Sequence, residues 1–211
     1  MRARLPDRPL SIAGRLALQD RSPRTIRYWN VSATVQLGEK EMSACYTVSD
    51  ALGATLEQFK VHREPGMKPR FEYAAGNPLQ PAPAPDLFAK VQESSVTWAD
   101  LTLPFLWWTG GRVVGTDSAK GRDCFLVEVN APAGEMKTPG YLRLWIDTQY
   151  RMLIRADECG PDGALRRRLT VQSFRKVDDE WMIKEISVDE TGARYRSMFS
   201  LREIRKLDAA P

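Results

Sequence analysis

The sequence predicts a mainly β (α+β) fold, in which a curved antiparallel sheet forms a half-open barrel with a few short helices covering its concave face. Two observations support this. Apolar and polar residues alternate with the period of strands in two separate parts of the chain, and the connections within each part are too short for crossover helices. Two meanders of about nine to eleven strands in total must curl, because strongly twisted open sheets rarely stay flat at that size.

The first meander occupies the N-terminal third of the chain. Residues 11–20 alternate as a half-buried strand, and residues 27–37 do so more clearly, with Trp29, Val31 and Val35 on one face. A turn at 38–40 leads into a strand that ends near residue 50, and Gly53 separates it from another over 54–61. These elements predict consecutive antiparallel strands.

The second meander follows Gly110 and Gly111. Strands are expected over 124–129, 141–147, 151–158, 165–177, 180–190 and 193–201, with a hairpin turn at 159–163. In the strand at 165–177, Arg166 and Arg168 share one face, and Arg167 shares the other with two leucines. The arginines are interpreted as solvated outer-face residues, with contact to an anionic head group or a partner as the alternative.

The joining segment has a different composition. Residues 65–85 carry six prolines, which predicts a loop around at most one short strand at 70–74. Asp86 is expected to cap a short helix over 86–92, and Ser95 or Thr97 a second helical turn through 98–101. Pro104 limits any helix beyond that point.

The bulk composition is that of a soluble globular protein. Its 211 residues, 43% hydrophobic and 27% charged, suit a single domain over 1–211, with flexible tails at 1–10 and 205–211. The net charge of +4 arises from 31 basic and 27 acidic side chains mixed along the chain, which argues against a dedicated nucleic-acid surface.

No run reaches the roughly 18 apolar residues that a membrane-spanning helix needs, and the polar start lacks the apolar core of a signal peptide. We expect a soluble protein. It is either cytoplasmic or the mature part of an exported protein whose signal peptide is absent from this sequence.

The sequence contains no recognisable motif for catalysis or for phosphate binding. His62 is the only histidine, no G-x-S-x-G elbow accompanies it, and we expect it to be an exposed or hydrogen-bonded structural residue. Gly110, Gly111 and Gly115 follow neither the dinucleotide-binding nor the P-loop spacing. The sequence therefore predicts no enzyme, no catalytic residue and no cofactor.

Metal and disulfide sites are not expected either. Carboxylates at Asp157, Glu158 and Asp162 lie near one hairpin and would suit calcium, but their spacing is not that of a known calcium loop, and a solvated turn is the preferred interpretation. The thiols of Cys45, Cys124 and Cys159 are too widely spaced for a metal motif and are interpreted as buried small hydrophobes, with one disulfide as the alternative.

The aromatic stretch at 96–108 is the candidate binding site. It contains three of the six tryptophans and fits neither helix nor strand periodicity. We expect a hydrophobic ligand site that joins this stretch to one tryptophan from each meander: Trp98, Leu101, Leu103, Phe105, Trp107, Trp108, Trp29 and Trp145. Two interpretations remain open. The stretch either fills the concave sheet permanently or acts as a lid over a pocket for alkyl chains, whose burial needs no polar partner.

The C-terminal half also resembles a known family. The order DLTLPFLWW, GRDCFLVEV, YLRLWID and MLIRADECGPDGALRRRLTVQSFRKVDDEWMIKEISVDE is similar to the outer-membrane lipoprotein-sorting (LolA/LolB-like) domains over roughly 96–204. The most specific parts are Trp145-Ile146-Asp147 and the Asp162-Gly163 hairpin, followed by Phe174 and Trp181. The Trp107-Trp108 pair, the long proline loop and the segment ARYRSMFSL depart from the family pattern.

The resemblance implies an unclosed barrel, a periplasmic or envelope-associated location, and binding of acyl chains of lipids or lipoproteins. A non-catalytic monomeric carrier, with peripheral membrane contact, is the leading hypothesis. The alternative is a protein-interaction or sensor module that binds an envelope protein through an outer apolar patch or an unpaired sheet edge.

Overall fold

The computed structural model describes residues 9–20, 24–37, 41–64, 67–132, 140–177 and 180–207. Over these residues the chain forms one antiparallel sheet of thirteen strands with one short α-helix and one 3-10 helix, so the predicted fold class is confirmed. The strands before the helices are β1 (Leu10–Gln19), β2 (Thr25–Leu37), β3 (Met42–Ser49), β4 (Thr55–Arg63), β5 (Arg70–Ala75) and β6 (Gln80–Ala82). The helices are α1 (Trp98–Thr102) and the 3-10 helix η1 (Pro104–Leu106). The strands after them are β7 (Arg112–Ala119), β8 (Arg122–Val129), β9 (Tyr141–Asp147), β10 (Leu153–Cys159), β11 (Leu165–Val177), β12 (Glu180–Glu190) and β13 (Arg196–Lys206).

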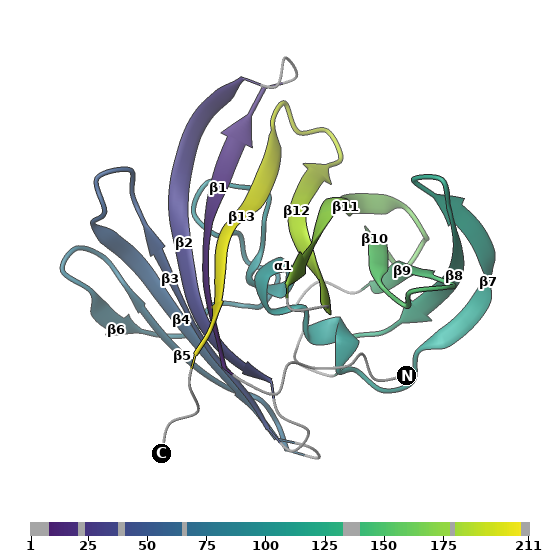
Figure 1. Cartoon of the computed structure of the whole chain (residues 1–211), viewed down its shortest axis with the longest axis horizontal. Coiled ribbons are helices and arrows are strands. Elements are labelled where there is room, and N and C mark those ends of the chain that lie inside the picture. The colour runs from purple at the N-terminus through teal and green to yellow at the C-terminus, as the bar shows by residue number, and fades with distance from the viewer. Residues whose placement is uncertain are drawn as a thin grey trace.

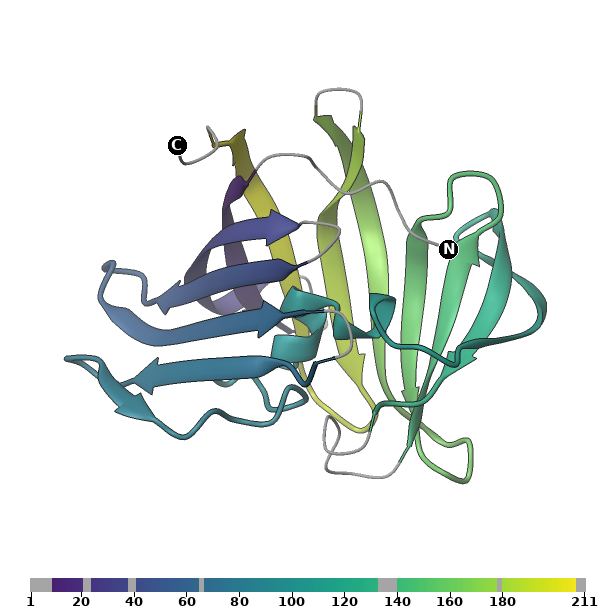
Figure 2. The same ribbon diagram turned by 90° about the horizontal axis from the view of Figure 1, so that it is seen from below.

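The first and last strands pair in the middle of the sheet. Its order is β6-β5-β4-β3-β2-β1-β13-β12-β11-β10-β9-β8-β7, so each meander forms one half and the β1–β13 ladder joins them. The two outermost strands, β6 and β7, are therefore neighbours in sequence but lie at opposite edges of the sheet. Residues 83–111, here called the bridging segment, connect these edges and carry α1, which lies within the arch of the sheet (Figures 1 and 2).

The concave face carries the main hydrophobic core. In β3 every second residue from Met42 to Val48 is buried, and β2 and β4 present Val31, Val35 and Phe59 to the same core. From the other half come Leu144 of β9, Leu169 of β11 and Val188 of β12, among others. Alternation along each strand thus produces one continuous apolar face, which the bridging segment covers in part.

Strands were underpredicted at the two edges. The short strand predicted at 70–74 is β5, but β6 in the proline-rich region and β7 had no predicted counterpart. At an edge, Pro81 of β6 gives up no ladder hydrogen bond, so proline does not prevent pairing there. Residues 112–118 of β7 are all exposed, which removes the alternation on which the prediction depends.

The helix predicted over 86–92 is not formed. Asp86 does accept a hydrogen bond at Oδ1 from the Phe88 amide at 2.7 Å, but the chain then turns, and Lys90 bridges to Thr97. The second predicted helix is correct. It is α1, with Thr97 as its N-cap and the Asp100 carboxylate accepting the Thr97 amide at 2.8 Å.

The strands extend into both predicted tails. Leu10 begins β1 and pairs with Lys206 at the end of β13, so residues 10, 205 and 206 belong to the sheet. The remainder of the tails, 1–8 and 208–211, lies outside the described residues. Among the described residues, no helix has the length and apolar character needed to cross a membrane.

A second, smaller core lies on the outer face of the C-terminal half. It consists of Ala119, Cys124, Trp145 and Ile154. The indole Nε1 of Trp145 donates to Asp117 Oδ2 at 2.9 Å, and this bond lowers the pKa of the Asp117 carboxyl. The Arg155 guanidinium stacks over the indole, with its carbon 3.9 Å from the Trp145 ring centroid. This core fixes β7 to the strands beside it.

Replacing Trp145 by alanine should therefore lower the free energy of unfolding by about 3–5 kcal/mol, the usual cost of emptying a large buried aromatic site. Urea denaturation measures this, and NMR titration should show the pKa of Asp117 rising toward its ordinary value. Trp181→Ala is the matched control, because Trp181 is 52% exposed and its loss should change stability by less than about 0.5 kcal/mol. Equal losses in the two variants would contradict this role of Trp145.

Candidate functional site

Trp98 fixes the start of α1 against the N-terminal half of the sheet. Its side chain is 1% exposed and stacks on Phe59 of β4, with ring centroids 4.7 Å apart and an interplanar angle of 18°. Tyr73 of β5 meets the indole edge-on at 6.4 Å. This tryptophan is a core residue, and no space separates it from the sheet that it covers.

A buried ion pair fixes α1 to the C-terminal half. Arg167 of β11, only 8% exposed, contacts Asp100 of α1 through Nη1, and its Nε donates to Glu158 of β10 at 3.2 Å. Burial opposes the charged form of Arg167, but the charges of Asp100 and Glu158 outweigh this effect and raise its pKa. Within the apolar core these three side chains determine where α1 sits.

Further polar contacts hold residues 90–101 on both halves. Burial raises the pKa of the Glu57 carboxyl on β4, which accepts a hydrogen bond from Gln92. The other contacts are Lys90 Nζ to Glu190 Oε2 (2.6 Å), Arg27 to Glu93, the Ser95 amide to Ser197 Oγ (2.8 Å) and Tyr46 Oη to the Leu101 carbonyl (2.9 Å). This part of the bridging segment is anchored at many points.

The next part is held differently. Leu103 adopts a left-handed backbone with φ of 46°, and the amides of Leu103, Leu106 and Trp107 bond only to carbonyls within the segment itself. Leu101, Leu103, Trp107 and Trp108 are half-buried against the core, and Leu106 is 51% exposed. Residues 103–107, here called the apolar flap, rest on the sheet mainly through side-chain packing.

On the concave face of β8 and β9, the side chains become more exposed from one end of the two strands to the other. At one end Val129 and Leu142 are each 3% exposed, whereas Val127, Phe125 and Ile146 toward the other end are only half-buried. Register pairs Phe125 with Ile146, and both share the concave side with the main core residues Val127 and Leu144. We call Phe125, Val127 and Ile146 the apolar strip.

The structure brings together seven of the eight residues that we expected to bind a ligand. Trp98, Phe105 and Trp29 are buried in the main core, and Leu101, Leu103, Trp107 and Trp108 pack against it. Trp145 does not join them. It projects from the opposite face of β9, into the outer core, because neighbouring residues of a strand point to opposite sides of the sheet.

Of the three acidic hairpin residues, Asp162 is exposed in the turn as predicted, whereas Asp157 and Glu158 are not solvated turn residues. Asp157 is 4% exposed on the outer face and binds Arg168 and Arg155, whereas Glu158 points inward to Arg167. Arginine contacts hold the pKa of Asp157 below its ordinary value, although burial acts in the opposite direction. Among the described residues no group of acidic, histidine or cysteine side chains is arranged to hold a metal ion.

The expectation for His62 is confirmed, since its Nε2 lies 2.8 Å from Glu64 Oε1. Cys45, Cys124 and Cys159 are free thiols; the last two are buried, as the preferred interpretation predicted.

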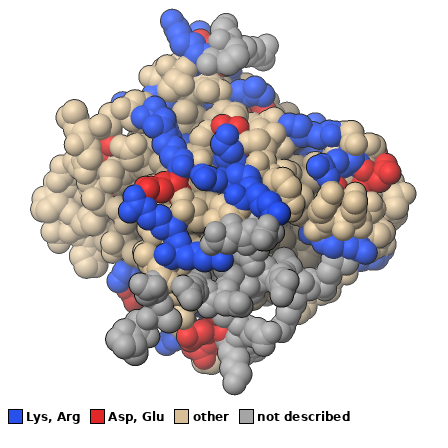
Figure 3. All heavy atoms as spheres, in the orientation of Figure 1, with Lys and Arg blue, Asp and Glu red and all other residues tan. Residues whose placement is uncertain are grey.

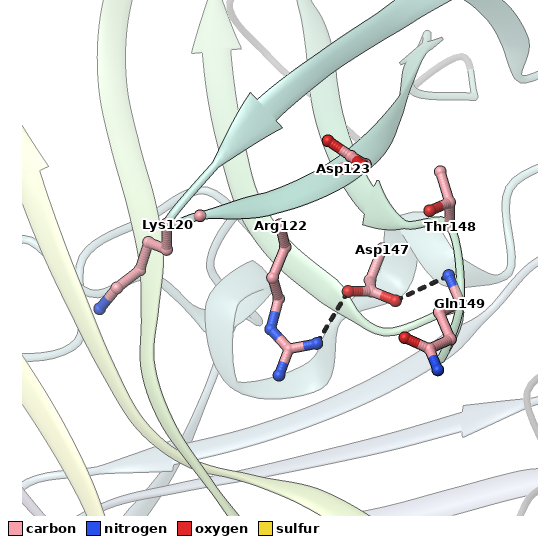
Figure 4. Close-up of a pocket in the computed structure, with 7 residues that line it drawn as sticks. Lys120, Arg122, Asp123, Asp147, Thr148 and Gln149 are labelled. Atoms are coloured by element: carbon pink, nitrogen blue, oxygen red, sulfur yellow. Dashed lines mark hydrogen bonds and ion pairs between the residues drawn. The ribbon is translucent and has the colours of Figure 1, made fainter.

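Two surface cavities are lined by none of the apolar-strip residues. One of about 430 Å³ is lined by polar residues at the β7–β8 and β9–β10 turns (Figure 4). There Asp147 already accepts hydrogen bonds from Arg122 and from the amides of Gln149 and Tyr150. The other, of about 650 Å³, lies beside Cys45 and His62 on the outer face of β3 and β4. Neither cavity includes an expected ligand residue.

Comparisons with known proteins agree with this architecture. A family model described as an uncharacterized protein matches residues 83–210, more than half of the chain. The chain belongs to this family. No curated protein matches the sequence.

Solved structures identify the fold of this family member. A DUF1329 family protein from Desulfovibrio piger is 12% identical with a TM-score of 0.79, covering 97% of this chain and 88% of that one. A putative outer membrane lipoprotein-sorting protein domain from Vibrio parahaemolyticus is 11% identical with a TM-score of 0.75, covering 96% and 87%. A LolA superfamily protein from Nitrosomonas europaea is 12% identical with a TM-score of 0.69, covering 99% and 90%. At these identities the likeness shows the fold alone: this chain has the LolA-like fold, as the sequence resemblance predicted, and these matches indicate no enzyme family.

In this family member, Asp100→Asn should lower the free energy of unfolding by about 3 kcal/mol, because the buried Arg167 would lose its closest counter-charge. Urea denaturation measures the loss. Asp189→Asn is the control, since Asp189 pairs with Arg196 at 3.6 Å on the surface and such pairs contribute less than about 1 kcal/mol. The double variant Asp100→Leu/Arg167→Met should lose less than the sum of its single variants, and strict additivity would contradict the coupling.

Proposed function

We propose that the protein is a non-catalytic binding protein of the cell envelope that holds acyl chains of lipids or lipoproteins on the apolar strip. The observation that carries the proposal is the division of the bridging segment. Residues 90–101 are anchored by polar contacts, whereas the apolar flap rests on the core through side chains that an alkyl chain can replace. Such a chain needs no polar partner and gains about 0.8 kcal/mol per buried CH₂.

The division also decides which residues move. With Trp98 fully buried and α1 fixed by Arg167, the N-terminal part of the stretch is permanent core filler. The lid is confined to the apolar flap and the adjoining Trp108. Movement of the flap would uncover the core residues that its side chains pack against without breaking an ion pair. The LolA-like fold and the description of the Vibrio protein domain as an outer membrane lipoprotein-sorting domain support the same function and a periplasmic location.

Peripheral contact with a membrane is part of this proposal. Lys and Arg side chains form a band across the face shown in Figure 3, over the part of the sheet where β1, β13 and β12 lie in Figure 1. Exposed basic residues of β12 and β13 include Lys184, Arg202 and Arg205, of which Arg205 pairs with Glu203. A basic surface of this kind is attracted to anionic lipid head groups.

Titration with a synthetic triacylated cysteine lipopeptide tests the proposal. Saturation should shift the tryptophan fluorescence, and at 100 times its Kd the ligand should raise the free energy of unfolding by about 2.7 kcal/mol. The double variant Trp107→Phe/Trp108→Phe should lose most of the fluorescence shift, whereas Trp181→Phe, which changes an exposed tryptophan, should keep it. If saturating lipopeptide causes no fluorescence shift and no stabilisation, the function is refuted.

An open sheet edge favours a second candidate function, binding of an envelope protein. Strand β6 has three residues with Pro81 among them, but β7 spans eight residues and exposes Val113 (61%) and Val114 (39%). Its ladder with β8 is irregular only between Val113 and Gly115. Unpaired backbone groups along such an edge can receive an added strand.

A pull-down from envelope extracts distinguishes the two functions. Under the second, the wild-type chain should recover one protein and no lipid, and Val113→Lys should lose that protein, because an edge lysine opposes strand addition. Leu52→Lys, at a 95% exposed turn, is the matched control. Co-purified lipid retained in Val113→Lys would argue for the acyl-chain function instead.

A further inference from the structure

A cation lies at the less buried end of the apolar strip. Arg151 follows the β9–β10 turn, and its guanidinium carbon is 4.9 Å from the centroid of the Phe125 ring. Phe125 is paired with Ile146, and Leu153, the first residue of β10, is paired with Ile146 from the other side. The strip therefore runs from the main core, against which Val127 and Ile146 pack, to a positive charge beside Phe125.

The turn fixes the position of Arg151 through its backbone. Asp147 Oδ1 accepts the amides of Gln149 at 2.9 Å and Tyr150 at 2.6 Å, and the Arg151 amide bonds to the Asp147 carbonyl at 3.1 Å. Figure 4 shows the Asp147 carboxylate between Arg122 and the Gln149 backbone. Arg151 itself has φ of 60°, a left-handed conformation unusual for a residue with a side chain. No side-chain partner is needed to hold it there.

Its charge is also available. The neighbouring guanidiniums of Arg122, Arg143 and Arg155 bind the carboxylates of Asp147, Glu128 and Asp157 on the outer face. Arg151 is exposed, and within the described part of the chain no carboxylate forms an ion pair with it. Arg151 differs from these arginines in its side of the sheet, and none of the described carboxylates neutralises its charge.

We propose that Arg151 binds the anionic head group of an amphiphile whose chain lies on the apolar strip. This inference rests on the proposed function and names its ligand class: a single-chain amphiphile ending in a carboxylate or a phosphate. A guanidinium offers parallel N–H donors that match either group, and it keeps its charge at any physiological pH. The Phe125 ring lies against the guanidinium without using a hydrogen-bond donor, so all its N–H donors can bind the anion.

Three probes with the same twelve-carbon chain test the assignment: dodecanol, dodecanoate and dodecyl phosphate, each below its aggregation concentration. Wild-type protein should bind at least one of the two anions about threefold or more tightly than dodecanol, as expected for one accessible ion pair. The tighter anion identifies the head group as carboxylate or phosphate. Isothermal titration calorimetry measures the three dissociation constants. Added salt should weaken the binding of the two anions and leave that of dodecanol unchanged.

The variants Arg151→Gln and Arg151→Glu separate charge from packing. In Arg151→Gln the two anions should bind no more tightly than dodecanol. In Arg151→Glu both anions should bind more weakly than dodecanol. Arg70→Glu, at an exposed arginine on β5 in the other half of the sheet, is the control and should leave the wild-type order unchanged. Melting curves of each variant confirm that the chain is folded.

The outcomes distinguish this inference from the function on which it rests. Equal binding of the three probes by wild-type protein overturns the head-group site but keeps the acyl-chain function. A preference for anions that survives in both Arg151 variants assigns the head group to another residue and overturns the inference. Failure of all three probes to bind overturns the acyl-chain function as well.

Discussion

Pairing of β1 with β13 at the centre of the sheet determines where everything else must lie. Once the chain ends meet there, the two meanders extend in opposite directions, and the residues between β6 and β7 have to cross from one edge to the other. The concave face is apolar and the crossing segment is rich in tryptophan, so the hydrophobic effect places the crossing inside the arch and not around it. The candidate site follows from topology before any side-chain detail is considered.

Within the bridging segment, polar residues fix the position of α1 and apolar residues make the packing contacts. Burying Arg167 with Asp100 and Glu158 carries a large desolvation penalty, and the net stability of such a group is small, but its geometry allows only one position for α1. The apolar flap has no comparable constraint, because packing contacts are individually weak and can be exchanged for those of another hydrocarbon. The bridging segment therefore has a fixed part, α1, directly followed by a part whose contacts can be exchanged, the apolar flap.

Much of this was predictable, and the failures have physical causes. Alternation located most strands and put Arg167 on the face of two leucines, but the interpretation of the arginines as solvated was wrong for Arg167, which is buried. Its partner Asp100 could not be named, because it is 67 residues away in sequence. Strand β7 was missed because an edge exposed on both faces has no alternation. The helix after Asp86 was wrong because its capping signal is equally satisfied by a turn, and burial of Val91 favours the turn. The alternation in YLRLWID had already separated Trp145 from Leu142 and Leu144, so its inclusion in the site contradicted the pattern itself.

The outer face of the C-terminal half bears on how fast a ligand can enter and leave. Glu128 is shared by Arg112 and Arg143, Asp157 by Arg155 and Arg168, and Trp145 packs beneath this lattice. Such cross-strand links stiffen the sheet from behind, so under the proposed function it would not have to flex when cargo arrives. Only the apolar flap would rearrange, and loops of that size move within nanoseconds to microseconds. The residence time of a bound chain would then depend on how much of its surface is buried, with little added delay from reshaping the protein.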